Sequence, residues 1–540
     1  MSNKAHDEWW RGAIIYQIYP RSFADTTGSG VGDLNGVTSK LDYVASLGVD
    51  GIWLSPFFRS PMKDYGYDVA DYVDVDPIFG TLDDFDQLVQ RAHSLDLKVV
   101  IDQVYSHTSD QHAWFKESRT SRDNPTSNWY VWADAKEDGT PPNNWLSVFG
   151  GSAWTWDARR QQYYLHNFLA EQPDLNLYDP AVQSALHNVA RFWLERGVDG
   201  FRLDAINFGM HDRQLRDNPP SVSPFRDLST PFRMQDQAFN LSQPGMPLML
   251  EHYRQVLDTY GEVFSVAEIG GATPMPTMHA YTRGHRRLST AYGFEFLSLP
   301  ELTADAVGSI LRSWPNGCDN GWPAWAFSNH DVPRAVSRWL PGVEHERRAE
   351  LILLLLVSLR GNLFVYQGEE LGLPQADVPF ERLLDPEAIA NWPHTAGRDG
   401  ARTPMPWERS IENGGFSTAA PWLPVDPLHL SRAVAQQESA DDSTLQCFRR
   451  LLAVRQKTSA LRLGDLDILT AEDGLLSFTR NYEGDIAHCA FNLGDEARPV
   501  VQRSAHNLTV VAGAGNVVLN SDRPAELEPY SGFIAVHDSR

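Results

Sequence analysis

The chain has 540 residues, of which 42% are hydrophobic, so it can bury a large core and is expected to form more than one domain. Its 70 acidic and 46 basic residues give a formal net charge of -24, which argues against nucleic acid or an anionic membrane surface as a partner and favours a neutral small-molecule substrate. The three cysteines have no metal-ligand spacing, so neither a zinc site nor a disulfide framework is indicated.

The first eight residues are polar and lack the apolar stretch of a signal peptide, so we expect a cytoplasmic protein. Residues 351–359 form the most apolar run, but they number nine, whereas a membrane-spanning helix needs about 20. This run is predicted to be a buried helix, and no membrane partner is expected.

Helix-forming and strand-forming patterns alternate along most of the chain. Residues 47–54 are echoed by residues 196–203, and in both copies a helical pattern stops at a glycine just before an apolar strand. Apolar runs without polar alternation are typical of parallel strands that are covered on both faces. Their number and their alternation with helices indicate the α/β class and a (β/α)₈ TIM barrel. The strands are predicted at 13–19, 51–55, 98–104, 200–206, 264–269, 291–296, 325–330 and 362–366.

The barrel does not account for the whole chain. Its first part is expected at 1–107, and the stretch 108–178, rich in Trp, Tyr, Asn, Gly and Pro, is too long for a loop and is predicted to be an inserted domain after the third strand. The barrel resumes over 179–464, with a polar, Pro-rich insertion at about 372–430. Short β-like segments separated by turn residues predict a C-terminal all-β domain, a β-sandwich, at 465–540.

Arg202 and Asp204 stand two residues apart at the end of the fourth predicted strand. Side chains at i and i+2 of a strand point to the same face, so the guanidinium would hold the carboxylate ionised. An isolated Arg-x-Asp pair is more often a structural ion pair. A buried, ionised carboxylate is also a candidate nucleophile, and the residues at the other strand ends decide between the two.

Carboxylates and histidines follow several other predicted strands. In a parallel barrel the catalytic side chains come from the C-terminal strand ends, where this sequence has His107, Glu268, His330 and Asp331. Two carboxylates in unlike environments suffice for acid and nucleophile chemistry at a sugar C1. Glu268 has no cation adjacent in sequence, so desolvation and nearby carboxylates are expected to raise its pKa and make it the general acid/base.

Asp331 is expected to stabilise positive charge in an oxocarbenium-like transition state. Its structural alternative is the N-cap of a following helix. His107 and His330 would each, in isolation, more often be core residues than ligands. Their positions beside strand-end carboxylates favour a role in substrate binding.

Four segments carry a family resemblance: 101–107, 200–204, 266–270 and 327–331. With them, in this order, the chain resembles glycoside hydrolase family 13, the α-amylase superfamily, and within it the α-glucosidase and oligo-1,6-glucosidase branch. The resemblance implies that Asp204 is the nucleophile, Glu268 the acid/base and Asp331 the transition-state stabiliser of a retaining mechanism.

The resemblance also implies contacts to the terminal glucose. Tyr67 matches an aromatic residue that stacks on the sugar, Asp68 an aspartate that binds its hydroxyls, and Arg398 an arginine that pairs with this aspartate and closes the pocket, which implies exo action. Gln172 begins a segment typical of enzymes for short oligosaccharides, and Ala205 stands where α-1,6-acting relatives tend to carry valine. The predicted substrate-binding residues are Tyr67, Asp68, His107, Phe149, Phe168, Gln172, Arg202, Ala205, Phe294, His330 and Arg398.

The three phenylalanines of this set, Phe149, Phe168 and Phe294, are expected to wall the pocket and the acceptor site, because apolar rings pack on sugar faces. Each of them could equally belong to the hydrophobic core.

The glycine-rich loop 25–33 resembles a calcium loop of related glucosidases, with Thr27 and Ser29 where Asn and Asp are usual. Replacing a carboxylate by a hydroxyl weakens a site for a hard cation. No cofactor is expected to be required, and one divalent cation, Ca²⁺ or Mg²⁺, is the only candidate; the alternative is a plain turn. Its ligands would be Asp25, Thr27, Ser29, Val31 and Asp33.

We therefore predict a retaining, exo-acting α-glucosidase for short α-glucosides, with α-1,4 linkages preferred and with transglucosylation. A transglucosidase, a sucrose isomerase or a trehalose synthase of the same family would share the first half of the reaction and is the alternative. A non-catalytic relative, such as a transporter heavy-chain subunit, would have a transmembrane helix and degraded catalytic positions. The sequence shows neither feature.

Overall fold

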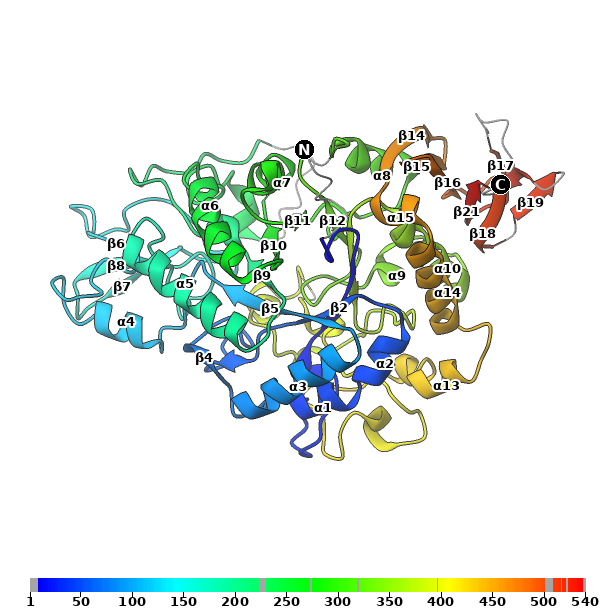
Figure 1. Cartoon of the computed structure of the whole chain (residues 1–540). Helices are drawn as coiled ribbons and strands as arrows, with labels where there is room; N and C mark the ends of the chain where they lie inside the picture. Colours follow the sequence, from blue (N-terminus) through cyan, green and yellow to red (C-terminus); the bar gives the residue numbers. More distant parts are fainter. Residues whose placement is uncertain are drawn as a thin grey trace.

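Apolar runs of the sequence form the parallel strands of one closed sheet. The computed structural model describes residues 8–537 except 223–229, 272–273, 318–319, 396, 501–507, 516 and 521–522. In this part of the chain the strand order is β11-β10-β9-β5-β2-β1-β13-β12, and a parallel bridge between Ala291 and Pro323 joins the two edges, which confirms the predicted TIM barrel (Figure 1). The barrel strands are β1 (Ile14–Ile18), β2 (Gly51–Leu54), β5 (Lys98–Val104), β9 (Gly200–Asp204), β10 (Phe264–Ile269), β11 (Thr290–Gly293), β12 (Ala324–Ala326) and β13 (Asn362–Tyr366).

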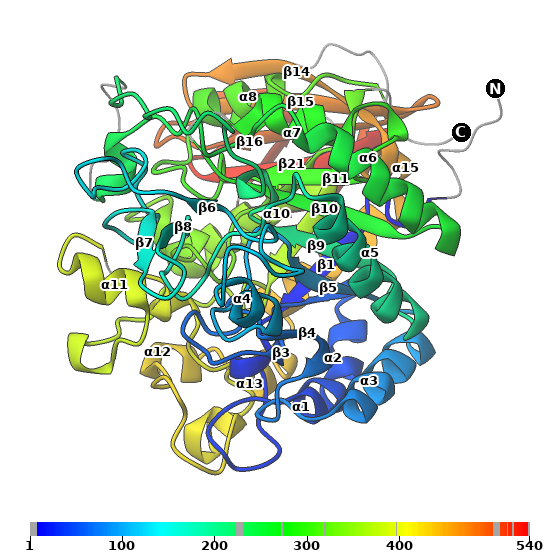
Figure 2. The same ribbon diagram turned by 90° about the vertical axis from the view of Figure 1, so that its left-hand side faces the viewer.

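Amphipathic helices surround the barrel strands (Figure 2). In α3 (Leu82–Ser94), Thr81 and Asp84 form a capping box, and apolar residues at helical spacing are buried. Most of the apolar run predicted to be a buried helix lies in α10 (His345–Ser358), as expected. The other described α-helices are α1 (Leu34–Ser39), α2 (Leu41–Ser46), α4 (Ala113–Ser118), α5 (Pro180–Glu195), α6 (Met246–Leu257), α7 (Pro274–Thr282), α8 (Ala304–Arg312), α9 (Ala335–Arg338), α11 (Pro386–Asn391), α12 (Pro427–Leu430), α13 (Val434–Glu438), α14 (Thr444–Lys457) and α15 (Ser459–Leu463).

Between β5 and α5 the chain forms a separate small sheet with its own tryptophan-rich core. Its strands are β6 (Trp132–Ala133), β7 (Trp154–Asp157) and β8 (Gln162–Leu165), in the order β6-β8-β7. The rings of Trp145 and Trp154 stack in this core, with their centroids 5.9 Å apart. We call residues 108–178 the inserted segment. A short hairpin, β3 (Phe58–Arg59) with β4 (Asp71–Val75), precedes it.

The C-terminal part of the chain is antiparallel β structure on the opposite side of the barrel from the inserted segment (Figure 1). Buried Arg480 of β15 attaches it to α10 by donating to the Ser358 carbonyl at the end of that helix. Arg455 of α14 donates to the neighbouring carbonyls of Val357 and Leu359. The strands of its two sheets are β14 (Asp465–Glu472), β15 (Leu475–Tyr482), β16 (Asp485–Asn492), β21 (Ser531–His537) and β18 (Leu508–Ala514), and then β17 (Arg498–Pro499), β20 (Arg523–Leu527) and β19 (Val517–Asn520).

Cys447 and Cys489 are buried free thiols, and Cys318 lies outside the described residues. Over the described ranges, none of the helices has the length and apolar character that crossing a bilayer requires.

Candidate active site

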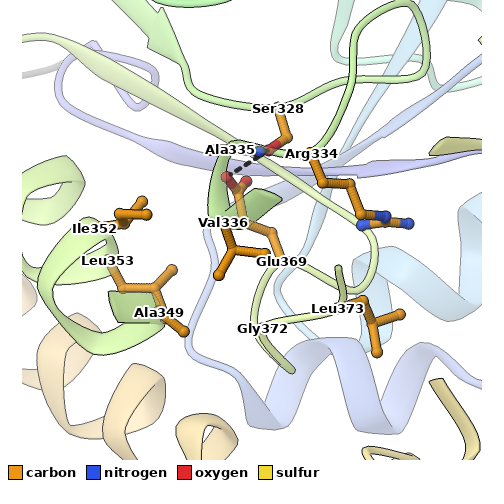
Figure 3. Close-up of a pocket in the computed structure, with 10 residues that line it drawn as sticks. All are labelled: Ser328, Arg334, Ala335, Val336, Ala349, Ile352, Leu353, Glu369, Gly372 and Leu373. Atoms are coloured by element: carbon orange, nitrogen blue, oxygen red, sulfur yellow. Dashed lines mark hydrogen bonds between the residues drawn. The ribbon is translucent and has the colours of Figure 1, made fainter. Parts of the chain in front are cut away.

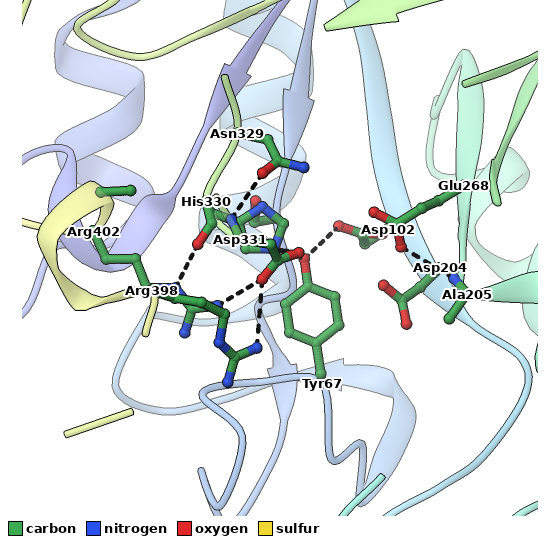
Figure 4. Close-up of polar contacts among 12 residues, drawn as sticks. Tyr67, Asp102, Asp204, Ala205, Glu268, Asn329, His330, Asp331, Arg398 and Arg402 are labelled. Carbon is green, nitrogen blue, oxygen red and sulfur yellow. Dashed lines mark hydrogen bonds and ion pairs between the residues drawn. The ribbon is translucent and has the colours of Figure 1, made fainter. Parts of the chain in front are cut away.

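Four carboxylates lie at the C-terminal ends of the barrel strands, where a parallel barrel places its reacting groups. Asp102 is in β5, Asp204 is the last residue of β9, Glu268 is near the end of β10, and Asp331 follows β12. Figure 4 shows Asp331 on one side of Tyr67 and the other carboxylates on the opposite side. The strand-end residues of separate motifs therefore converge on one place.

Arg202 binds three of these carboxylates at once. Its Nη1 lies 2.6 Å from Asp102 Oδ1 and 2.5 Å from Asp204 Oδ1, and its Nη2 lies 2.5 Å from Glu268 Oε1. The expected pairing with Asp204 is present. Glu268 has no cation beside it in the sequence, but in the fold the Arg202 guanidinium reaches it from the neighbouring strand.

The pKa values of Asp204 and Glu268 are both raised. The rise was expected for Glu268, but the expectation that Arg202 would hold Asp204 ionised was wrong, because burial outweighs the guanidinium. Burial raises the pKa of each of these carboxyl groups to about 7. Arg202 lowers both pKa values, but burial outweighs it and the neighbouring carboxylates add to the rise. Glu268 also accepts hydrogen bonds from the Tyr292 hydroxyl over 3.1 Å and from the Ala205 N–H over 3.3 Å. Near neutral pH the two carboxyl groups therefore share about one proton, as an acid and nucleophile pair requires.

Asp331 has a different environment. It lies 2.8 Å from Arg402 Nη2, 3.4 Å from Arg398 Nη1 and 3.2 Å from His330 Nε2. Burial alone would raise its pKa, but the fields of His330, Arg402 and Arg398 lower it below the usual range. Burial lowers the pKa of His330 itself, whereas the two guanidiniums are permanent charges that favour the ionised form of Asp331. The N-cap alternative is wrong, because α9 begins at Ala335 and Arg334 is its N-cap.

The expected pairing of Asp68 with Arg398 was wrong. The carboxylate of Asp68 is fully buried and accepts bonds from the Ser60 hydroxyl and two backbone N–H groups of its own loop. Arg398 instead lies 2.8 Å from Asp64 and 2.7 Å from Asp385. The loop turns so that Asp64 faces the site and Asp68 faces back into the loop, which a sequence motif with two aspartates does not reveal.

Gln172 and His107 join Asp64 in a buried cluster. Gln172 Nε2 lies 3.2 Å from Asp64 Oδ2 and 3.1 Å from His107 Nε2, and His107 is neutral because burial lowers its pKa to about 4. We call Asp64, His107, Gln172 and Arg398 the Asp64 cluster. The structure thus brings three predicted residues together around a carboxylate that was not predicted.

Aromatic rings flank the Asp64 cluster. The ring centroids of Phe168 and His107 are 5.1 Å apart, and those of Phe149 and Phe168 are 5.9 Å apart. The Arg398 guanidinium carbon lies over the Phe149 ring, 5.1 Å from its centroid. Phe294 is half-buried and belongs to a different apolar cluster, which includes Tyr292. Two of the three predicted phenylalanines therefore wall the cluster.

Tyr67 and His330 form a stacked pair, with ring centroids 5.3 Å apart and planes 9° apart. The Tyr67 hydroxyl hydrogen-bonds to His330 Nε2, and Gln17 Nε2 contacts His330 Nδ1 at 2.8 Å. This network holds the Tyr67 ring between the Asp331 side and the Asp204 side of the site (Figure 4).

Ala205 has a left-handed backbone, with φ 41° and ψ 34°. This conformation ends β9 at Asp204, two residues earlier than predicted, and turns the chain so that the Ala205 N–H points at Glu268. Its side chain packs in an apolar cluster with Phe208 and Leu241, beside Phe168. Ala205 therefore connects Asp204 with Glu268 and faces the aromatic wall.

Three residues that hold the site were missed: Asp64, Asp385 and Arg402. Asp64 lies in the same motif as Tyr67, three residues earlier, and Arg402 lies four residues after Arg398. A search for charged residues close to those already selected would have proposed both. Asp385 has no such signal, because only the folded insertion after β13 places it against Arg398.

Two cavities lie outside the carboxylate cluster. A cavity of about 10 Å³, room for a single water molecule, lies beside Glu369, whose carboxylate accepts a hydrogen bond from Ser328 (Figure 3). A larger pocket of about 220 Å³ lies between the inserted segment and the loop after β9, and its lining includes Tyr178 and His211. Neither is lined by the reacting carboxylates.

The loop 25–33 does not fit a divalent cation. Asp25 accepts hydrogen bonds from Thr27, Gly28, Gly30 and the Ser417 hydroxyl, at 2.6 to 2.9 Å. The remaining members are also engaged: Asp33 accepts from Thr26 and Gly36, and the Ser29 hydroxyl donates to the Val31 carbonyl. Oxygens that a hard cation would need are thus used by the loop itself. Over the described residues, no group of three or more His, Cys, Asp or Glu is placed to hold a metal ion.

A chelator is therefore expected to change neither activity nor melting temperature. Asp25→Ala, in contrast, should lower the free energy of unfolding by about 1–3 kcal/mol, because it leaves loop donors and Ser417 without an acceptor. Thermal unfolding with and without EDTA, and of Asp25→Ala beside Asp25→Asn, measures both effects. A melting temperature that falls with EDTA and returns with Ca²⁺ would contradict the hydrogen-bonded loop.

Comparison with known proteins agrees with this geometry. Residues 17–464 match the family model of the α-amylase catalytic domain. The chain is 51% identical over 535 residues to a probable alpha-glucosidase of Rhizobium meliloti (strain 1021), covering 98% of this chain and 97% of that protein. It is 36% identical to an oligo-1,6-glucosidase of Heyndrickxia coagulans, covering 90% and 92% of the two chains. It is also similar to the crystal structure of the alpha-glucosyl transfer enzyme XgtA, with a TM-score of 0.94 and 47% identity over 98% and 99% of the two chains.

Proposed function

Because this chain belongs to the α-amylase family of glycoside hydrolases, we propose that it is a retaining, exo-acting α-glucosidase that releases the terminal non-reducing glucose of short α-glucosides. One observation carries the proposal: the Arg202 guanidinium binds both Asp204 and Glu268, with a nitrogen-to-oxygen distance of 2.5 Å to each carboxylate. Carboxyl groups of retaining enzymes lie about 5–5.5 Å apart, whereas inverting enzymes need roughly 6.5–9.5 Å for a water molecule between them. Two carboxylates on one guanidinium favour the retaining arrangement.

In the first step the Asp204 carboxylate attacks C1 of the glucose, and the bond from C1 to the leaving oxygen breaks as Glu268 gives that oxygen its proton. In the second step Glu268 takes a proton from water, the water oxygen bonds to C1, and Asp204 leaves as a carboxylate. Two inversions return the α anomer. Asp331, kept ionised by its two arginines, would stabilise the positive charge that develops at the ring in each step.

The Asp64 cluster supports exo action. Its arginine, Arg398, pairs with Asp64 between β3 and β4 and with Asp385 in the insertion after β13, and Phe149 lies against its guanidinium. A glucose bound beside Tyr67 would meet this ion-paired wall on its non-reducing side, so that only the end of a sugar chain fits. The hydroxyls of the glucose would bond to Asp64, Gln172 and Arg398.

The proposal also covers the linkage that is cleaved and the molecule that accepts the glucosyl group. The small side chain of Ala205, beside the nucleophile, supports a preference for α-1,4 linkages. The similarity to the α-glucosyl transfer enzyme XgtA supports glucosyl transfer to hydroxyl acceptors as a second activity. Phe168 and Phe208, whose rings pack at 5.1 Å beside Ala205, offer such an acceptor an apolar surface.

The test is a panel of α-linked glucose disaccharides and sucrose, with and without an added alcohol. We expect α-glucose as the first-formed product, faster release from maltose than from isomaltose, and a glucosylated alcohol when the alcohol is present. NMR of the fresh reaction identifies the anomer. First-formed β-glucose would rule out the retaining mechanism, and conversion of sucrose into isomeric disaccharides without release of glucose would favour the isomerase alternative.

A further inference from the structure

A chain of hydrogen bonds between buried polar side chains joins the inserted segment to the loop that follows β9. The side-chain amide of Asn167 donates to the carboxylate of Asp174, and Asn240 Nδ2 donates to Asn167 Oδ1 over 2.8 Å. Asn218 Nδ2 donates in turn to Asn240 Oδ1 over 2.8 Å. All four residues are at most 3% exposed. We call Asp174, Asn167, Asn240 and Asn218 the amide chain.

Each amide in this chain has one orientation that satisfies its neighbours. The backbone N–H of Phe239 donates to Asn218 Oδ1 over 3.0 Å, so Asn218 presents its NH₂ group to Asn240. For the same reason Asn240 presents its NH₂ group to Asn167, and Asn167 presents its NH₂ group to one carboxyl oxygen of Asp174. The other carboxyl oxygen of Asp174 accepts the backbone N–H of Asn167 over 3.3 Å. Aligned hydrogen bonds in a buried setting reinforce one another, and loss of one member leaves the others unsatisfied. The amide chain therefore acts as a single connection.

At one end the amide chain holds the wall of the Asp64 cluster. Asp174 is two residues from Gln172, whose Nε2 contacts Asp64 at 3.2 Å. Asn167 immediately precedes Phe168, one of the aromatic rings beside the cluster. The groups proposed to bind glucose therefore sit on the same short segment as two members of the amide chain.

At the other end it reaches the strand ends that carry the reacting carboxylates. Asn240 is two residues from Ser242, whose N–H donates to the Asn207 carbonyl over 2.7 Å. Asn207 Nδ2 donates to the Gly270 carbonyl over 2.9 Å, and the Gly270 N–H donates back to Asn207 Oδ1 over 3.2 Å. Asn207 lies three residues after the nucleophile, and Gly270 lies two residues after Glu268. The connection thus ends at β9 and β10.

We propose that Asn167 and Asn240 are positioning residues for the glucosidase reaction, because the amide chain sets the distance between the glucose-binding wall of the inserted segment and the carboxylates of β9 and β10. This inference rests on the proposed function, because its test measures the kcat of glucose release. The residues touch no reacting atom in this arrangement; they act through Gln172 and Phe168 at one end and through Asn207 at the other.

Breaking the amide chain should separate binding from chemistry. Glucose would still meet the Asp64 cluster, so KM should change less than threefold. The bound sugar would be displaced relative to Asp204 and Glu268, and a displacement of about 1 Å can lower a rate roughly 100-fold. We therefore expect Asn240→Ala to lower kcat roughly 10- to 100-fold on a short α-glucoside, with most of the loss in kcat.

The matched control is Asn362→Ala. Asn362 is also a fully buried asparagine, but it begins β13 and donates to the Trp10 carbonyl at the opposite end of the barrel strands from the site. Both variants should lower the melting temperature, because each removes a buried amide. Only Asn240→Ala should lower kcat, when both are assayed well below their melting temperatures.

An exchange of partners provides a sharper test. Asp174→Asn alone sets an NH₂ group against the N–H groups of Asn167, and Asn167→Asp alone sets two acidic side chains side by side and removes the NH₂ donor to Asp174. In the double variant the new amide at position 174 can donate to the new carboxylate at position 167, which can still accept from Asn240. We expect each single variant to lose at least tenfold in kcat and the double variant to recover most of it.

An unchanged kcat in Asn240→Ala would overturn the proposal, and so would a double variant whose loss of kcat is as large as the losses of its two single variants combined. Equal loss of kcat in Asn240→Ala and Asn362→Ala would do the same, since it would reduce the amide chain to general stability. A wild-type protein that releases no glucose from any α-glucoside would instead contradict the proposed function. Hydrogen exchange of the inserted segment in the variants would then still report whether the connection exists.

Discussion

Asp204→Asn is expected to lower kcat by about 10⁴- to 10⁶-fold while the protein remains folded, because an amide is a far weaker nucleophile than a carboxylate. The fold should tolerate the change, since Arg202 keeps ion pairs with Asp102 and Glu268 at 2.6 and 2.5 Å. An amide at position 204 can also still accept a hydrogen bond from the guanidinium. Circular dichroism and a melting curve check the fold, and hydrolysis of an aryl α-glucoside measures the rate.

Azide should partly restore turnover in the smaller variant Asp204→Gly, where it can take the place of the missing carboxylate. The product would be β-glucosyl azide, because a single displacement inverts C1. Asp102→Asn is the matched control, since it removes a different carboxylate from the same guanidinium and leaves the nucleophile in place. Azide rescue of the control, or wild-type activity in Asp204→Asn, would show that Asp204 is not the nucleophile.

Glu268→Gln is expected to lose roughly 10²- to 10⁴-fold in kcat/KM on maltose, because the leaving sugar oxygen needs a proton from the general acid. An aryl α-glucoside with an acidic leaving group needs less help and should lose much less in kcat/KM. Its kcat should nevertheless fall, since hydrolysis of the glucosyl-enzyme needs the same residue as a base. A comparison of the two substrates in both proteins measures the difference.

The pH profile of the same variant tests the shared proton. Burial raises the pKa of both Asp204 and Glu268 to about 7, so the wild-type kcat/KM profile should be bell-shaped around that value. It falls on the acid side when the pair takes up a second proton, so that Asp204 is protonated, and on the alkaline side when the pair loses its last proton. Glu268→Gln has no proton to lose, so the alkaline limb should disappear, and the acid limb should move to lower pH because one competing negative charge is gone.

Glu369→Gln is the control for this profile. Burial also raises the pKa of Glu369 to about 7, but its carboxylate contacts Ser328 beside a small cavity and not the Arg202 group (Figure 3). The profile of this variant should keep both limbs. If its alkaline limb vanished and that of Glu268→Gln stayed, the acid/base role would belong elsewhere.

Short-range patterns in the sequence were sufficient for the barrel. A strand buried on both faces must be a short apolar run, and a parallel barrel must place the residues after each run at one mouth, so the convergence of Asp204, Glu268 and Asp331 could be predicted from their positions. The pairing of Arg202 with Asp204 follows from the same local geometry, since residues i and i+2 share a face.

Contacts between distant segments could not be read from local patterns. Arg398 pairs with Asp64 across 334 positions, and Arg202 reaches Glu268 from the neighbouring strand. The choice between Asp64 and Asp68 depends on how one loop folds back on itself, and the loop 25–33 uses its carboxylates for its own N–H groups. The hydrophobic periodicity of a sequence carries no information about such ion pairs and hydrogen bonds.

The sequence by itself therefore determined the barrel and the carboxylates that meet at its mouth, because these depend on burial and on spacing within single strands. Only the tertiary structure decided how the charges are shared, which aspartate pairs with Arg398, and how the inserted segment is tied to β9 and β10. Those features depend on side chains from separate segments meeting in a buried space, where each charge or amide must find a partner.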